Sequence, residues 1–163
     1  MTEQQEASED AVMTRIGQAI ILLHAGDREE ARNRLGEIWS EIGEDGAPLH
    51  RCTLAHYMAD AQDDPADELA WDLRALAAAD GPAGGPHAAV RAFYPALHLN
   101  LAADYVKLRR PEAARLHLGR ARAASGALPD DGYGNGVRAA IARLEERLAA
   151  ARPDAGPFPG QHA

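Results

Sequence analysis

The chain has 163 residues, enough for one domain with a hydrophobic core. Aromatic residues make up only 5% of it and no run alternates as a strand would, so a β-sheet protein is disfavoured. The formal net charge is −8, which disfavours a nucleic acid partner because acidic surfaces repel phosphate backbones. This charge serves solubility first, and among partners it favours basic peptides or basic protein surfaces.

The sequence also predicts a compartment. Cys52 is the only cysteine, so an internal disulfide is impossible, as is usual in a reducing cytoplasm. The first ten residues are acidic and polar and lack the basic start and apolar core of a signal peptide. The longest apolar run, 19–23, is far shorter than the ~20 residues that span a bilayer. We therefore expect a soluble cytoplasmic protein without membrane association.

Two amphipathic helices are predicted first, after a disordered segment over residues 1–8. The helix over 9–25 has one apolar stripe, formed by Val12, Ile16, Ala19, Ile20 and Leu23. Gly26 ends it, because glycine readily adopts positive φ after the last turn. Asp27 is expected to cap the next helix. The stripe of that helix consists of Ala31, Leu35, Ile38, Trp39 and Ile42.

A second pair of helices is predicted over 48–62 and 65–79. The former has a broad apolar face, which favours contact from more than one side. In the latter, Asp64 suits the N-cap and Pro65 the first helical position. Its inward stripe is expected to be Leu69, Leu73 and Leu76.

Glycine and proline then interrupt the pattern, which predicts a linker or insertion around 80–93. Helices are expected over 95–108 and from Pro111 to about Ser125. A last helix carries Tyr133, Val137, Ala140, Ile141, Leu144 and Leu148 on one face. Residues 152–163, rich in proline and glycine, are expected to form a disordered tail.

Small and large residues alternate on the facing stripes of the helices over 95–108 and 111–125. The first has Leu101, Ala102 and Tyr105 on one face, and the second has Ala114, Leu118 and Ala121. This pattern resembles the tetratricopeptide repeat (TPR), in which small residues let two antiparallel helices approach. The first predicted pair resembles it too, with Ala19 and Ala31 in the small positions and Leu22 replacing the tyrosine. The middle pair matches less well, because Met58 replaces the aromatic residue and leucines replace alanines.

The resemblance implies an all-α fold. It would be a short right-handed α-solenoid of about three TPR-like hairpins plus a C-terminal capping helix, in a single domain over 9–151. It also implies a non-enzymatic scaffold or adaptor that binds a protein or peptide in the groove lined by the first helices of its repeats. Asn100 matches a position from which this family often holds a ligand backbone. Lys107 lies two turns further along the same face, where the pair would suit an acidic group. The alternatives are an interhelical hydrogen bond for Asn100 and a solvated helix end for Lys107.

Four further residues complete the candidate binding set. Arg51, His56 and Asp60 are polar groove candidates on the helix over 48–62. Trp71 lies off the predicted leucine stripe, so it is either an exposed anchor for a partner or packed against a neighbouring repeat.

Two other functions stay open. The first is a self-associating homodimer that uses Trp71 and the irregular middle pair. The second is a metal-binding or catalytic helical protein that uses Cys52, His56 and Asp60, which are spaced i, i+4 as helical metal ligands are. No catalytic or nucleotide-binding motif is present in the sequence, so we expect neither enzymatic activity nor a cofactor.

Overall fold

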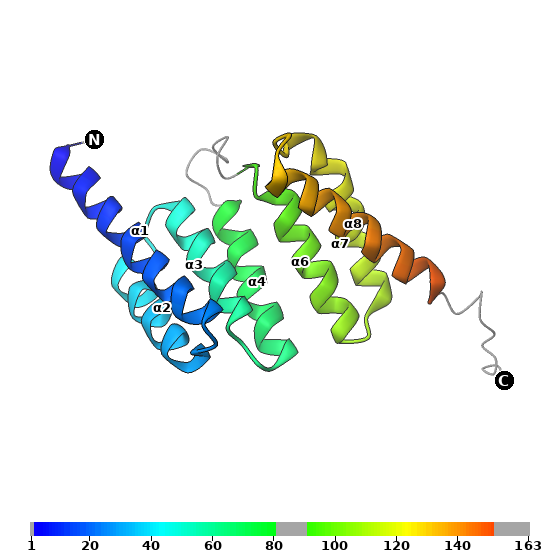
Figure 1. Ribbon diagram of the computed structural model, residues 1–163, viewed down its shortest axis with the longest axis horizontal. Coiled ribbons are helices and arrows are strands. Elements are labelled where there is room, and N and C mark those ends of the chain that lie inside the picture. The colour runs from blue at the N-terminus through cyan, green and yellow to red at the C-terminus, as the bar shows by residue number, and fades with distance from the viewer. Residues whose placement is uncertain (1, 81–90, 152–163) are drawn as a thin grey trace. The chain divides into compact units, whose positions relative to one another are not determined.

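A computed structural model describes residues 2–80 and 91–151, apart from the side chains of residues 5 and 6. Over these residues the protein is all α-helical and contains no strand (Figure 1). The elements are α1 (Glu3–His24), α2 (Arg28–Ile42), α3 (Pro48–Asp60), α4 (Pro65–Ala79), α6 (Tyr94–Lys107), α7 (Pro111–Ala124), a 3-10 turn η1 (Ser125–Ala127) and α8 (Gly132–Ala150). No helix among the described residues is long and apolar enough to cross a membrane.

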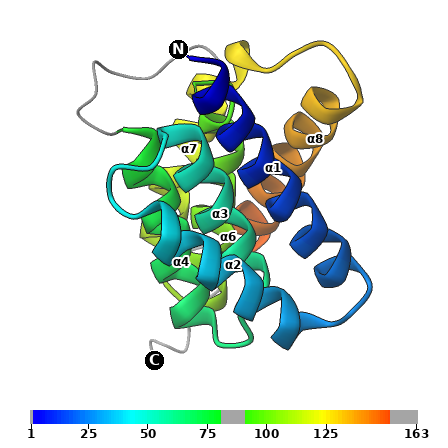
Figure 2. The same ribbon diagram turned by 90° about the vertical axis from the view of Figure 1, so that its left-hand side faces the viewer.

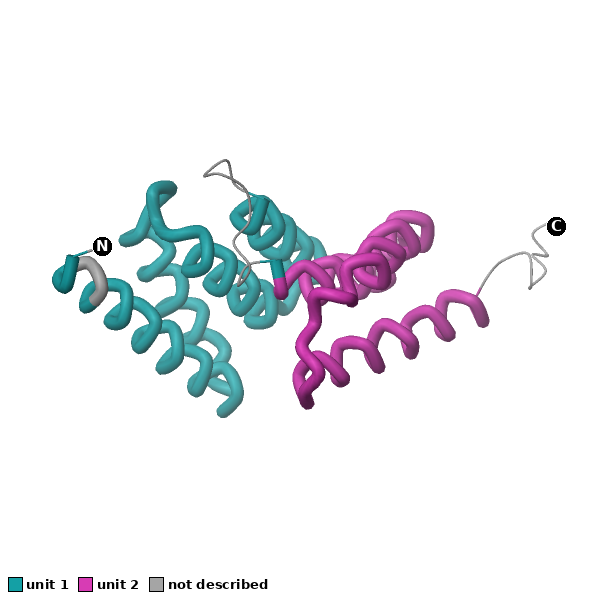
Figure 3. The backbone as a smooth tube through the Cα atoms, turned by 90° about the horizontal axis from the view of Figure 1, so that it is seen from above, with its two compact units in different colours: residues 1–91 teal, residues 92–163 magenta. Residues whose placement is uncertain are grey.

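The chain forms two compact units, residues 1–91 and 92–163 (Figure 3). The boundary falls within the predicted linker over 80–93. Most of that linker, and the tail over 152–163, lie outside the described residues.

In unit 1, α1 packs on α2 and α3 packs on α4, while α3 also contacts α1 and α2 (Figure 2). The stripes predicted for the first two helices are the ones that are buried. Their core, with the contribution of α3, consists of Ile16, Ala19, Leu35, Ile38, Leu54 and Met58. Helices α1 and α2 therefore each bury the apolar stripe that their periodicity indicates.

The predicted disorder over residues 1–8 is wrong from Glu3 onward, because α1 begins there. Glutamate, glutamine and alanine dominate this segment, and all three are good helix formers. Glu3 also places a negative charge at the positive end of the helix dipole, which stabilises the first turn.

The predicted inward stripe of α4 is also wrong. The buried residues of α4 are Asp72, Ala75 and Ala79, whereas Leu73 is 41% exposed. The observed stripe is rotated by one residue, roughly 100° around the helix axis, from the leucine stripe. Alanines on both sides, including Ala59 of α3, allow α3 and α4 to pack backbone close to backbone.

The helix caps differ in their chemistry. Asp64 caps α4 as predicted, because its carboxylate accepts a hydrogen bond from the Ala66 N–H at 2.9 Å. The predicted side-chain cap of α2 by Asp27 is absent. Instead, the Asp27 N–H donates to the carbonyl of Leu22, and Gly26 takes φ +92°. The end of α1 thus uses the backbone N–H of Asp27, while the side chain of this residue forms no cap hydrogen bond with α2.

In unit 2, α6 packs on α7, and both contact α8. The core contains the residues on which the repeat resemblance depends, together with the inner face of α8: Ala102, Ala114, Leu118, Ala121, Ile141, Leu144 and Leu148. Leu101 is fully buried, and Tyr105 packs against this core. His117 is buried as well, and this burial, together with the nearby positive charge of Arg120, lowers its pKa.

Candidate functional site

The two tryptophans of the chain meet in unit 1. Trp39 lies near the end of α2, and Trp71 lies in the middle of α4. Their ring centres are 5.2 Å apart and the rings are nearly perpendicular, at 82°. This edge-to-face arrangement places the positive edge of one ring against the negative face of the other. Trp71 is therefore half-buried and packs against the core formed by the preceding hairpin and α3.

An arginine covers each tryptophan. The Cζ atom of Arg51 lies 4.2 Å from the ring centre of Trp39, and that of Arg74 lies 4.3 Å from the ring centre of Trp71. Both distances are well within the range of a cation–π contact. These four residues, Arg51, Trp39, Trp71 and Arg74, are called the Arg–Trp cluster below.

The two arginines differ in how their donors are used. Nη1 of Arg51 donates a hydrogen bond to the carbonyl of Gly43, the residue that ends α2 with φ +63°. Arg51 therefore holds the loop after α2 in place. Arg74 is exposed and forms no ion pair among the residues that the structure describes. Its planar guanidinium can therefore offer two parallel donors to a carboxylate.

A cavity of about 890 Å³ opens beside the cluster. Its walls come from four segments of unit 1, which are the end of α2 with Trp39, the loop over 43–46, the start of α3 and the end of α4. Arg51 and Arg74 supply positive charge to this wall, and Glu44 and Asp45 supply exposed carboxylates from the loop. The site thus combines an apolar aromatic surface with charges of both signs, which suits a segment of peptide better than a small apolar molecule.

His56 and Asp60 lie together one turn apart on α3, as their spacing requires. The rings of His56 and Tyr57 meet edge to face with centres 4.8 Å apart. Burial lowers the pKa of His56, and the nearby carboxylate of Asp60 partly opposes this by raising it. His56 is therefore favoured in its neutral form by its surroundings, and Asp60 is exposed.

Cys52, His56 and Asp60 do not bring their ligand atoms together as a three-residue metal site within the described parts of the chain. Cys52 is buried in the core, and this burial raises the pKa of its thiol to about 12. A thiolate, the form that binds metal, is therefore strongly disfavoured at neutral pH. The i, i+4 spacing of these residues reflects the packing of α3 and does not carry a metal site.

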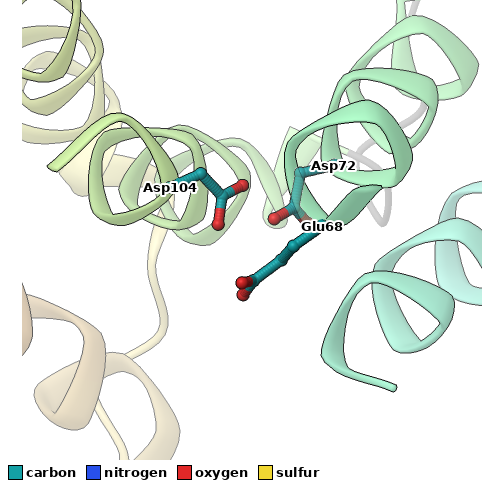
Figure 4. Close-up of side chains that lie close together, drawn as sticks. All are labelled: Glu68, Asp72 and Asp104. Carbon is teal, nitrogen blue, oxygen red and sulfur yellow. The ribbon is translucent and has the colours of Figure 1, made fainter. Parts of the chain in front are cut away.

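Asn100 and Lys107 lie on α6 in unit 2, and Asp104 lies between them on the same face. Asn100 is half-buried, Lys107 is exposed and Asp104 is almost fully buried. All three interact with other groups of the chain. Figure 4 shows Asp104 on α6, and it shows Glu68 and Asp72 one turn apart on α4. A ligand held by Asn100 and Lys107 would therefore have to accommodate the carboxyl group of Asp104 between them.

Sequence reasoning singled out Arg51 and Trp71 but did not predict the cluster. It assigned Trp39 to the core and did not consider Arg74. One signal was available, because Arg74 follows Trp71 by three residues and side chains at that spacing are neighbours on a helix. The meeting of Trp39 with Trp71 has no such signal, because it depends on how α2 and α4 lie around α3.

No protein-family model, curated protein or solved structure matches this chain.

Proposed function

We propose that this chain is a TPR-like, non-enzymatic adaptor that binds a peptide segment of a partner protein in the cavity beside the Arg–Trp cluster. The proposal treats the three hairpins as repeats of a short right-handed solenoid and α8 as its C-terminal capping helix. The observation that carries it is the cluster itself, which combines two stacked cation–π pairs, a tryptophan in the cavity wall and one arginine with donors to spare.

Two hairpins support the repeat. The same number of residues separates Ala19 from Ala31 in α1/α2 and Ala102 from Ala114 in α6/α7, and all four are buried. Both hairpins also turn through three residues with the same backbone hydrogen bonds. Asp27 N–H donates to Leu22 in the first, and Arg110 N–H donates to Tyr105 in the second.

The charges in the cavity wall define the peptide. Arg74 favours one acidic side chain, held by two parallel hydrogen bonds. Trp39 favours an adjacent apolar or aromatic side chain. Glu44 and Asp45 in the loop favour basic residues beside them, and the net charge of −8 acts in the same direction. The preferred ligand is therefore a mainly basic peptide with a single acidic residue next to an apolar one.

The tryptophans make this proposal directly measurable. The chain contains two, and both belong to the cluster, so intrinsic tryptophan fluorescence reports on this site alone. Peptides would be selected from a displayed random library on the wild-type protein and then titrated while the tryptophan emission is followed. We expect selected peptides to change the emission. In Arg74→Ala we expect binding weaker by about tenfold or more, since a hydrogen bond to a charged group contributes roughly 1.5–3 kcal/mol.

Matched variants make the test specific. Arg74→Lys retains the charge but loses the planar pair of donors, so it should recover only part of the affinity. Arg143→Ala removes an exposed arginine of α8 in unit 2 and should leave the affinity unchanged. A different result would overturn the cavity as the binding site. Selected peptides would then bind without changing the emission, and the double substitution Asn100→Ala with Lys107→Ala would abolish their binding. That result would favour the face lined by the first helices of the hairpins. A concentration-dependent dimer with no selected peptide would favour the self-association alternative.

A further inference from the structure

Two histidines of unit 2 face each other between α6 and α7. The Nδ1 atoms of His98 and His117 are 3.1 Å apart. The ring centres are 5.3 Å apart and the ring planes differ by 21°. The distance between the centres nearly equals the distance between the nitrogens plus the two ring radii, which is the largest value possible, so the rings meet edge to edge. One Nδ1 then carries the proton and donates it to the lone pair of the other.

The same separation fits two ligands of one metal ion. Zinc–imidazole bonds are about 2.0–2.1 Å long, so two nitrogens bound to one ion lie about 3.0–3.4 Å apart at the usual angles. The 3.1 Å between the two Nδ1 atoms falls within this range. Binding requires both rings to turn about their side-chain bonds, so that the two lone pairs point toward a common ion beside the line that joins the nitrogens.

The rings are held by their neighbours. The ring of Tyr105 lies parallel to that of His117, with centres 5.5 Å apart and an angle of 15°. Tyr94 packs edge to face on His98 with centres 6.4 Å apart. The pair lies on two helices that pack directly on each other, so little order has to be gained on binding. His117 is only 8% exposed, while His98 is half-buried, which leaves an approach for an ion from solvent.

We propose that His98 and His117 bind one divalent transition-metal ion of the Zn²⁺, Ni²⁺ or Cu²⁺ class through their Nδ1 atoms. Two imidazoles without a carboxylate suit these ions and not Mg²⁺ or Ca²⁺. The histidine that holds its proton on Nδ1 shifts it to Nε2, so both rings bind as neutral ligands and no electron is transferred. Solvent water completes the coordination. The ion then links α6 to α7, and the hairpin becomes more stable as the metal concentration rises.

The test is a calorimetric titration of the untagged full-length protein with ZnCl₂, repeated with NiCl₂. We expect one equivalent to bind. His98→Asn and His117→Phe should each weaken binding by more than about tenfold, since each removes one of two protein ligands. His117→Phe keeps an aromatic ring against Tyr105, and thermal unfolding without metal would show that the hairpin remains folded.

Two controls assign the ion to this pair. His24→Gln and His56→Gln replace histidines of α1 and α3 and should leave the affinity unchanged. In ¹⁵N spectra of the histidine side chains, Zn²⁺ should shift the Nδ1 resonances of His98 and His117 and no other Nδ1 resonance. The proposal would be overturned if the folded protein bound neither Zn²⁺ nor Ni²⁺. It would also be overturned if His98→Asn and His117→Phe both bound the ion with the wild-type affinity.

Discussion

The hairpins α3/α4 and α6/α7 are each built from two helices that pack on each other, but different side chains fill their interfaces. In α6/α7, leucines and alanines are buried together, as Leu118 and Ala114 of α7 illustrate. In α4 the alanines Ala75 and Ala79 are buried, while Leu73 is 41% exposed. A helix that presents alanine can approach its neighbour closely, and in α4 Leu73 lies on the exposed side instead.

The difference shows that periodicity alone does not decide which face of a helix is buried when two sets of residues have helical spacing. Leu69, Leu73 and Leu76 have helical spacing, and so do Asp72, Ala75 and Ala79. Hydrophobicity alone selects the leucines. The closeness of α3 selects the alanines, because a leucine side chain has no room between two adjacent backbones.

Substitutions on the two stripes of α4 should give the largest contrast. Ala75→Leu adds three carbons to a position with no exposed surface, so we expect it to lower the free energy of unfolding by about 1–3 kcal/mol. Leu73→Ala should change it by less than about 0.5 kcal/mol. Urea denaturation followed by circular dichroism measures both. A larger loss in Leu73→Ala than in Ala75→Leu would place the leucine stripe inside and refute the packing described above.

A second contrast between a crowded and an open position lies in unit 2, at the glycines that begin α8. A Cβ at Gly134 would lie 1.9 Å from the carbonyl oxygen of Pro129, whereas one at Gly136 would meet nothing within 4 Å. Gly134→Ala should therefore cost roughly 1–2 kcal/mol of unfolding free energy, despite the better helix propensity of alanine. Gly136→Ala should gain about 0.5–1 kcal/mol from that propensity. Equal effects of the two substitutions would contradict the predicted clash at Pro129.

The smallest effect is expected at the hairpin turns. Gly26 after α1 and Arg109 after α6 occupy the same position in the turn and both have positive φ, +92° and +61°. Glycine adopts this conformation without steric cost and arginine does not. Arg109→Gly should therefore raise the free energy of unfolding by about 0.5–1 kcal/mol, and Gly26→Ala should lower it by a similar amount. Thermal unfolding of the two variants beside the wild type provides the measurement, and a loss of stability in Arg109→Gly would show that the arginine side chain stabilises the turn.

Sequence reasoning succeeded where a helix has one apolar face. The stripes of α1 and α2 and the facing stripes of α6 and α7 are buried as expected, because each offers a single set of apolar side chains at helical spacing. It succeeded again where capping residues mark the start of a helix, as in α4, where Asp64 is the N-cap and Pro65 the first helical residue. The disorder expected near Glu3 failed for the opposite reason, since a polar segment without an apolar stripe can still have good helix propensity.

The candidate sites depended much more on the tertiary structure. Trp71 stood out in the sequence, but its contact with Trp39 joins residues of α2 and α4. His98 and His117 did not stand out in the sequence, and they meet because the chain turns after α6 and α7 packs back along it. Contacts of this kind join positions far apart in the chain, which leave no local pattern to detect.

The amino-acid sequence by itself therefore determined that the described chain is helical, where most of its helices begin and which face of the unambiguous ones is buried. These properties depend on propensity, capping and spacing within a few residues. Only the tertiary structure decided which stripe of α4 is buried, which aromatic rings meet and which two imidazoles face each other. These outcomes depend on the distance between neighbouring backbones, which is set by all the side chains packed between the helices together.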